Sequence, residues 1–193
     1  GPETRPKRGE PDETRRRLVA AAAQEFNRVG FHGTDSNRLA RAAGYAPGTF
    51  YKHFADKRAI LLAAYEEWVT VEWAAIADVL ADGGSREALA ARIVDMVVTL
   101  HRRWRGLRAS LRVLIAEDEE ARAFYRGQRR RQLDLLAGFR AGATPGMRER
   151  DAVLLYTLER VCDAIADGEL RDLGLSVEVT MAHLRDLILA VLR

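Results

Sequence analysis

Residues 30–54, GFHGTDSNRLARAAGYAPGTFYKHF, say more about function than any other part of this chain. They read as two short helices joined by a turn at Gly44, with the second helix beginning at Pro47. A proline is tolerated there because its missing N–H would have no partner in the first helical turn. This arrangement is typical of a helix-turn-helix, whose second helix enters the DNA major groove.

Polar side chains at the end of this stretch are candidate DNA contacts. Thr49 can exchange a hydrogen bond with a base edge and can pack its methyl group on thymine. Four further side chains can reach phosphates: Tyr51, Lys52, His53 and, at the start of the next helix, Lys57. Two alternatives stay open, since Tyr51 could also pack in the core and His53 could instead bind carbonyls at a helix end.

These positions resemble the TetR family of transcriptional regulators over roughly residues 15–62. The shared pattern appears here as Arg15 with Leu18, Ala21-Ala22 with Phe26, Gly30-Phe31 with Thr34, Ala40 with Ala43-Gly44, and residues 48–57. The resemblance implies DNA contacts at Thr34, Ser36, Ala46, Pro47, Thr49, Tyr51, Lys52, His53 and Lys57. The chain departs from the family at Ala46, where Ser or Thr is frequent, and at Tyr45, where Val is common, so its operator sequence is expected to be its own.

Composition excludes several other classes of protein. The chain has 193 residues and one cysteine, Cys162, which excludes an intrachain disulfide and a multi-cysteine zinc site. The four histidines are scattered, and no nucleophile–base set or phosphate-binding glycine loop is present, so we expect no enzyme activity, metal or cofactor. No run of 18 apolar residues occurs, so we expect no membrane span and a cytoplasmic location.

Charge is unevenly distributed along the chain. Residues 1–58 contain 12 Lys and Arg against 7 Asp and Glu, which gives +5, whereas the remainder contains 19 against 21, which gives −2. A basic head on a mildly acidic body suits DNA binding, although an arginine-rich solvated surface would look the same. Arg5, Lys7 and Arg8 could enter a minor groove as a basic arm or could belong to a disordered tail.

The whole chain is expected to be all-α, with about nine helices. Long β-branched alternating runs are absent, while Ala, Leu, Arg and Glu dominate. Residues 1–11 are expected to form a flexible basic tail, 12–57 a three-helix DNA-binding head, and 58–193 a helical body for ligand binding and dimerisation. Helices are expected over about 12–29, 35–43, 47–53, 57–81, 86–103, 107–116, 119–140, 148–167 and 176–192.

Apolar stripes on the last two helices are candidate dimer seams. Steps of three and four residues place these on one face of each helix: Leu154, Leu158, Val161 and Ile165, then Met181, Leu184, Ile188 and Val191. Such stripes could equally be intramolecular core. The resemblance favours the dimer, because the family interface is a four-helix bundle from this region.

Aromatic and polar residues in the body are candidates for a small-molecule pocket or for ordinary core. They are Trp68, Met96, His101, Trp104, Phe124, Tyr125, Tyr156 and Glu159. Glu159, Arg160 and Asp163 could be a ligand anchor, a buried ion pair or a solvated rim. The run from Arg129 to Arg131 is expected to form a solvated helix face, with a basic surface patch as the alternative.

These features together predict a homodimeric repressor that binds a palindromic operator and is released by a small apolar or amphipathic effector. The fourth helix is expected to transmit the signal, with ligand shifting the population toward a spacing of the heads that no longer fits DNA. A regulator without an inducer remains an alternative. An all-α enzyme or carrier whose head only resembles a DNA reader is another.

Overall fold

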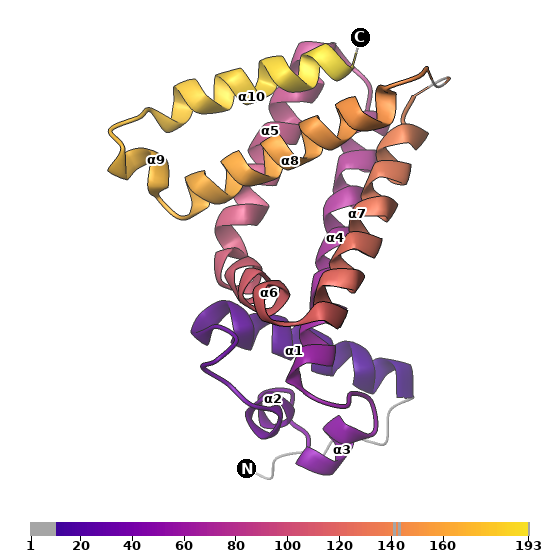
Figure 1. Ribbon diagram of the computed structural model, residues 1–193, viewed down its shortest axis with the longest axis vertical. Helices are drawn as coiled ribbons and strands as arrows, with labels where there is room; N and C mark the ends of the chain where they lie inside the picture. The colour runs from indigo at the N-terminus through magenta and orange to yellow at the C-terminus, as the bar shows by residue number, and fades with distance from the viewer. Residues whose placement is uncertain (1–10, 141, 143, 193) are drawn as a thin grey trace. The chain divides into compact units, whose positions relative to one another are not determined.

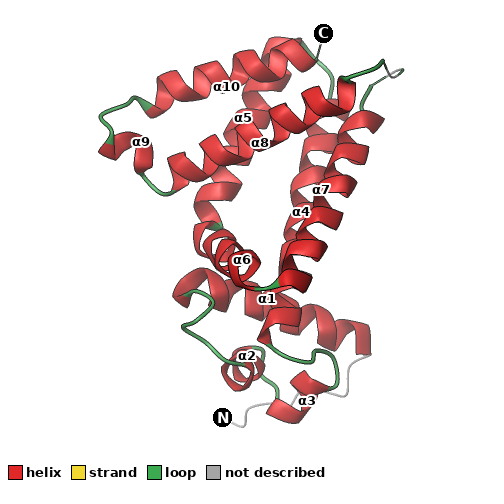
Figure 2. Ribbon diagram, in the orientation of Figure 1, coloured by secondary structure: helices red, strands yellow, loops and turns green. Residues whose placement is uncertain are grey.

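The computed structural model describes residues 11–140, 142 and 144–192. Every regular element in these residues is a helix, which confirms the predicted all-α fold (Figure 2). Arg5, Lys7 and Arg8 of the predicted tail lie outside the described residues. None of the helices described is long and apolar enough to cross a bilayer, and these residues contain no cluster of side chains suited to a metal ion.

The helices follow the predicted order, with one addition. They are α1 (Pro11–Val29), α2 (Ser36–Ala42), α3 (Pro47–Tyr51), α4 (Lys57–Ala81), α5 (Arg86–Arg103), α6 (Arg105–Glu117), α7 (Glu119–Gly138), α8 (Met147–Ala166), α9 (Glu169–Asp172) and α10 (Val177–Val191) (Figure 1). The described residues therefore form ten helices, where about nine were expected. The extra element, α9, is a single turn and is too short to produce a periodic pattern of apolar residues.

Two compact units make up the chain. The first comprises Gly1–Glu66 and Gly106–Ala121, and the second comprises Glu67–Arg105 and Arg122–Arg193. The predicted boundary between residues 57 and 58 stays a prediction, while this division places residues 58–66 and 106–121 with the helix-turn-helix. Helix α4 is continuous through Glu66, so it begins in one unit and ends in the other.

The core of the first unit is apolar. Leu18, Phe26, Leu39 and Phe50 are completely buried, and α2 packs against both α1 and α3. Ala22 of α1 is completely buried in this core as well. The ring of Phe50 lies near that of Phe54, with centroids 5.9 Å apart, and both are buried, so these two residues hold the short α3 in place.

Helix α6 joins the first unit through a close backbone approach to α1. A Cβ atom at Gly106 would lie 1.9 Å from the carbonyl oxygen of Asn27, so only glycine fits there. The Asn27 side chain accepts a hydrogen bond from the backbone N–H of Leu107 at 3.0 Å. The Ser110 hydroxyl donates to the Phe26 carbonyl at 3.3 Å. These contacts hold the start of α6 against the last turn of α1.

The second unit is built around α5, which packs against both α8 and α10 (Figure 1). Its buried residues include Val94 and Val98 of α5 and Ile165 of α8. The buried side of α4 passes through Trp68, Glu72 and Ile76, whereas Val71 is 51% exposed.

Candidate functional site

The helix-turn-helix begins with a well-formed cap and a tight turn. The Asp35 side chain accepts a hydrogen bond from the backbone N–H of Arg38 at 2.9 Å, which satisfies a free donor at the start of α2. Gly44 follows α2 with φ +80°, a conformation that glycine adopts without steric cost. The Tyr45 N–H then donates to the Ala40 carbonyl at 2.9 Å, and this bond turns the chain into α3.

Helix α3 exposes the side chains expected to contact DNA. Tyr51 is 56% exposed, and its ring meets the buried Phe50 edge to face, so only part of the ring packs in the core. Lys52 and Ala46 are exposed. Four other predicted contacts are partly exposed: Pro47, Thr49 and His53 in or beside α3, and Ser36 in α2. Ala46 caps α3 without a side-chain hydrogen bond, as expected where Ser or Thr is replaced.

Thr34 and Lys57 differ from the other predicted contacts because both point into the protein. The Thr34 hydroxyl is buried and has no hydrogen-bond partner. The Lys57 ammonium donates to the carbonyls of Phe31 at 2.8 Å and of Thr34 at 3.2 Å, and it lies 4.2 Å from the centre of the Phe31 ring. These bonds attach the start of α4 to the turn after α1, which gives Lys57 a structural role that the sequence pattern did not indicate.

A charged bridge joins the starts of α4 and α7 within the first unit. Arg58 contacts Asp56 at 3.1 Å and Asp118 at 2.6 Å. Each carboxylate also accepts a backbone N–H, from Ala59 in one case and from Ala121 in the other. Partial burial would raise the pKa of Asp56, but the Ala59 N–H and Arg58 outweigh it and lower the pKa. The hydrogen bond from the Ala121 N–H lowers the pKa of Asp118 most, and Arg58 lowers it further, while burial raises it by a smaller amount.

A cavity of about 460 Å³ lies within the second unit. Its volume is in the range of sites that hold small organic molecules. Most of its lining is apolar and comes from α4, α5, α7, α8 and α10. The lining residues are Glu72, Trp73, Ile76, Leu80, Ile93, Val97, His101, Leu136, Phe139, Arg140, Met147, Arg150, Leu154, Leu155, Leu158, Glu159, Ile188, Val191 and Leu192.

Two of the eight predicted pocket residues, His101 and Glu159, line this cavity. Trp68 is buried behind it, with its ring 5.3 Å from that of His101, and Tyr125 binds Glu159. The remaining four lie outside the lining: Met96, Trp104, Phe124 and Tyr156. The aromatic character of a residue alone could not show whether it lines the cavity or packs in the core. The outcome depends on which face of each helix is covered by neighbouring helices.

Several residues predicted as a dimer seam instead lie inside the protomer. Leu154, Ile165, Leu184 and Ile188 are buried, whereas Leu158, Val161, Met181 and Val191 are partly exposed. Leu154, Leu158, Ile188 and Val191 line the cavity. Larger apolar exposures occur beside them on α8 and α10 and in the segment between: Val153, Tyr156, Leu173, Leu175 and Val179. The dimer interface stays a prediction.

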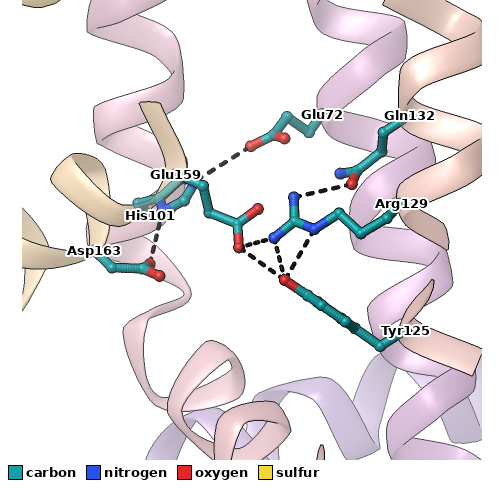
Figure 3. Close-up of polar contacts among 7 residues, drawn as sticks. All are labelled: Glu72, His101, Tyr125, Arg129, Gln132, Glu159 and Asp163. Atoms are coloured by element: carbon teal, nitrogen blue, oxygen red, sulfur yellow. Dashed lines mark hydrogen bonds and ion pairs between the residues drawn. The ribbon is translucent and has the colours of Figure 1, made fainter. Parts of the chain in front are cut away.

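One end of the cavity carries a buried histidine between two acids (Figure 3). Nδ1 of His101 lies 2.9 Å from the Asp163 carboxylate, and Nε2 lies 3.5 Å from Glu72. All three residues are buried and come from three helices, α5, α8 and α4. Asp163 is thus a buried hydrogen-bond partner of His101 and not part of a solvated rim.

Beside this histidine, Arg129 forms a second buried cluster (Figure 3). Its guanidinium binds Glu159 and the Tyr125 hydroxyl and donates to Gln132 at 3.2 Å. It lies 4.7 Å from the ring centres of both Tyr125 and Tyr156. The expected solvated face is therefore wrong at Arg129, which turns inward to neutralise Glu159.

The Tyr125 hydroxyl stays protonated in this environment. Burial raises the pKa of the phenol, and the negative charge of Glu159 adds to that effect, while Arg129 opposes it. The neutral phenol can therefore donate to Glu159, at 3.4 Å, while accepting from Arg129. Arg160, the remaining charge on this part of α8, is exposed and pairs with Glu169 at 2.9 Å.

The family match lies entirely within the first unit. Residues 18–64 match the family model described as "Bacterial regulatory proteins, tetR family". The chain is 42% identical to the uncharacterized HTH-type transcriptional regulator YdgC of Bacillus subtilis (strain 168) over 48 residues. This aligned segment covers 25% of each chain. Over 54 residues it is 35% identical to the HTH-type transcriptional regulator UidR of Escherichia coli (strain K12), which is 28% of each chain. The match thus spans about a quarter of each relative's length.

Solved structures share the fold over nearly the whole chain. The fatty acid degradation regulator FadR from Bacillus halodurans superposes with a TM-score of 0.69 at 20% identity, covering 97% of this chain and 99% of that one. FadR from Bacillus subtilis in complex with stearoyl-CoA gives a TM-score of 0.66 at 16% identity, covering 91% and 98%. A putative regulator from Pseudomonas aeruginosa PAO1 gives 0.71 at 15% identity, covering 96% and 91%. At these identities the likeness concerns the fold alone.

Proposed function

We propose that this chain is a transcriptional repressor of the TetR family that binds operator DNA and is released by a small molecule, because residues 18–64 match that family's model. The observation that carries this proposal is the exposure of Tyr51 and Lys52 and the partial exposure of Thr49, in α3 and at its end, inside the segment that matches the family model. The matched proteins are named as regulators, not as enzymes.

The DNA contacts divide into base reading and phosphate binding. Thr49 sits in the first turn of α3, where a recognition helix approaches base edges, and its hydroxyl and methyl suit a mixed contact. Lys52 and Tyr51 follow at the end of the helix and suit phosphate oxygens. Ala46 and Pro47 are small, so the α3 backbone can approach the groove closely.

Dimerisation is proposed through α8 and α10, since one short reading helix alone would bind weakly and operators read by such helices are two-fold symmetric. The exposed apolar side chains Val153, Tyr156 and Val179 would bury more new surface there than the predicted stripe. A dimer would place two copies of α3 about 34–36 Å apart, in successive major grooves.

The cavity of the second unit is the proposed effector site. Its walls are largely apolar, with a few buried polar groups at one end, which suits an apolar or amphipathic molecule. A structural relative, FadR from Bacillus subtilis, is described in complex with stearoyl-CoA.

Two chain segments can carry a signal from the cavity to the head. Helix α4 runs without interruption from Lys57 to the cavity residues Glu72 and Trp73. Helix α5 contributes His101 to the cavity and is followed by Gly106, whose backbone rests on α1. An effector would act by favouring one arrangement of these segments, and it can shift the population only by its difference in affinity for the two.

The proposal is tested by fluorescence anisotropy with labelled DNA from the chain's own upstream intergenic region. We expect Thr49→Ala to cost about 1–3 kcal/mol of binding free energy on the preferred sequence. Lys52→Ala should weaken binding to all sequences and lower the salt slope by about one. Arg130→Ala, an exposed cation on α7, should leave affinity unchanged. Wild-type protein that binds no promoter DNA would refute the function, and unchanged affinity in both head variants would refute the site.

The dimer is tested by analytical ultracentrifugation of Val179→Asp. Val179 is 57% exposed on α10, so the charge should leave the protomer folded while weakening a dimer that buries this face. Val71→Asp provides a matched control, because that side chain is 51% exposed on α4. A wild-type monomer at micromolar concentration, or equal behaviour of both variants, would contradict this interface.

A further inference from the structure

The turn between α1 and α2 holds two cationic side chains on its backbone. The ammonium of Lys57, at the start of α4, donates to the carbonyl oxygens of Phe31 at 2.8 Å and of Thr34 at 3.2 Å. The guanidinium of Arg38, in α2, donates to the Gly33 carbonyl at 3.1 Å. Three carbonyls of residues 31–34 are therefore bound by positively charged side chains.

The turn itself is folded closely onto the end of α1. Gly30 follows that helix with φ +79°, and a Cβ atom at Gly33 would lie 2.2 Å from the Val29 carbonyl oxygen. Carbonyls in such a turn are not paired by a helix ladder, so they need donors from elsewhere when they are shielded from water. Lys57 supplies donors to two of them from as far as 26 residues along the chain.

The Lys57 ammonium is occupied on several sides. It has three N–H donors, and two carbonyls lie within hydrogen-bond distance. The buried Phe31 ring also lies against it, with its centre 4.2 Å from Nζ, a distance at which an aromatic ring attracts a cation. A phosphate oxygen would have to replace one of these contacts. Lys52, by contrast, is exposed at the end of α3.

The turn leads directly into the reading part of the helix-turn-helix. Asp35 follows Thr34 and caps α2 by accepting the Arg38 N–H at 2.9 Å. Helix α2 in turn packs against α3. A contact that fixes residues 31–34 against α4 therefore also fixes α2, and through α2 it fixes α3. Side chains that read bases depend on such support, because a binding site that is held loosely loses affinity.

We propose that Lys57 is a positioning residue for the recognition helix and not a phosphate contact. It fastens the turn at residues 31–34 to the start of α4, and so sets the place from which Thr49 reads a base. This assignment rests on the proposed function, because it names how the DNA-reading surface of the same regulator is held. It departs from the DNA contact that the family resemblance implies for Lys57, whereas Lys52 keeps the role of binding phosphate.

The first test uses the wild type. The chain contains three lysines, Lys7, Lys52 and Lys57, so the acetylation of each can be followed by mass spectrometry. In the free chain Lys57 should react about tenfold or more slowly than Lys52, the ratio expected for loss of one hydrogen bond to a charged group. DNA from the chain's own upstream intergenic region should slow the reaction of Lys52 and leave that of Lys57 unchanged.

The second test compares Lys57→Met with Lys52→Met, which remove the same charge from a side chain of similar length. Anisotropy is measured over a range of salt concentrations with promoter DNA and with scrambled DNA of the same composition. Lys52→Met should weaken both complexes and lower the salt slope by about one. Lys57→Met should keep the wild-type slope and lower the ratio of the two affinities about tenfold, the loss expected when one base contact is misplaced.

The ratio also separates positioning from a role in stability alone. Lys57→Met that only destabilised the fold would reduce the folded fraction, which cancels when the affinities for two DNAs are divided. An unchanged ratio would therefore overturn the proposal. So would a salt slope lowered by about one in Lys57→Met, the sign of a lost phosphate contact.

Protection of Lys57 by DNA as strong as that of Lys52 would overturn the proposal as well. Acetylation is measured on the wild type, so this test stands even if the Lys57 variant fails to fold. Wild-type protein that binds no promoter DNA would reject the proposed function. Promoter binding combined with strong protection of Lys57 would reject only the role proposed for this residue.

Discussion

The helix-turn-helix and the second unit place their polar groups in opposite ways. In α1 to α3 the buried residues are apolar apart from Thr14 and Thr34, and the polar side chains of α3 face solvent. In the second unit the buried set includes charged and polar residues from four helices: Glu72, His101, Arg129, Gln132, Asp151 and Asp163. A surface that reads an external polymer needs its polar groups outside, whereas a cavity for a small molecule needs them inside. The difference is consistent with the proposed functions of the two units, DNA binding by the first and effector binding by the second.

The comparison predicts that neutralising a buried charge in the second unit should cause the largest loss of stability. Asp151 is 1% exposed and binds Arg140 through both oxygens. Asp151→Ala would leave a largely buried guanidinium unpaired, at a cost of about 3–5 kcal/mol in the free energy of unfolding. Urea denaturation measures this loss.

The matched control is Asp134→Ala, which removes the partner of Arg148 in a pair whose carboxylate is 68% exposed. An exposed pair of this kind contributes about 0–1 kcal/mol. Equal losses in the two variants would show that burial does not govern the second unit's ion pairs.

The first unit should instead be sensitive to backbone packing. Gly106→Ala places a Cβ atom 1.9 Å from the Asn27 carbonyl oxygen, so α6 would have to move from α1 at a cost of about 1–3 kcal/mol. Gly127→Ala in α7 meets nothing nearer than Arg130 Nη2 at 4.0 Å, and should stabilise the helix by about 0.5–1 kcal/mol. Thermal unfolding of both variants gives the signs, and a stabilised Gly106→Ala would contradict the close approach.

A smaller, pH-dependent effect is expected at the start of α4. Asp56→Ala removes the cap of Ala59 and one contact of Arg58, which should cost about 1 kcal/mol at neutral pH. The folded-state pKa of Asp56 is lowered, so its contribution is complete above the unfolded pKa of about 3.9 and is lost as pH falls through the folded value.

Stability measured from pH 7 down to pH 2 should therefore show the wild type and Asp56→Ala converging in acid. Asp78→Ala, at an exposed position further along α4, should stay within about 0.5 kcal/mol of the wild type throughout. A gap between wild type and Asp56→Ala that persists at the lowest pH would contradict the assigned cause.

Local sequence signals predicted the helices because caps, glycine stops and apolar spacing act within a few residues. The start of α2 after Asp35 and its stop at Gly44 are examples. The same signals could not show that Lys57 turns toward the carbonyls of Phe31 and Thr34, since that contact joins segments far apart in the chain. The inward turn of Arg129 was missed for the same reason, because its partner Glu159 lies on another helix.

By itself, the sequence determined an all-α fold, the helix-turn-helix at its start and the resemblance of residues 18–64 to the tetR family, because these depend on short-range spacing of residue types. Only the tertiary structure decided which apolar stripe faces a neighbouring helix and which borders the cavity. It placed Leu154 and Ile188 on the cavity wall and gathered Glu72, His101 and Glu159 at its polar end. The physical reason is that burial and charge compensation depend on the packing of whole helices, which no single periodic pattern contains.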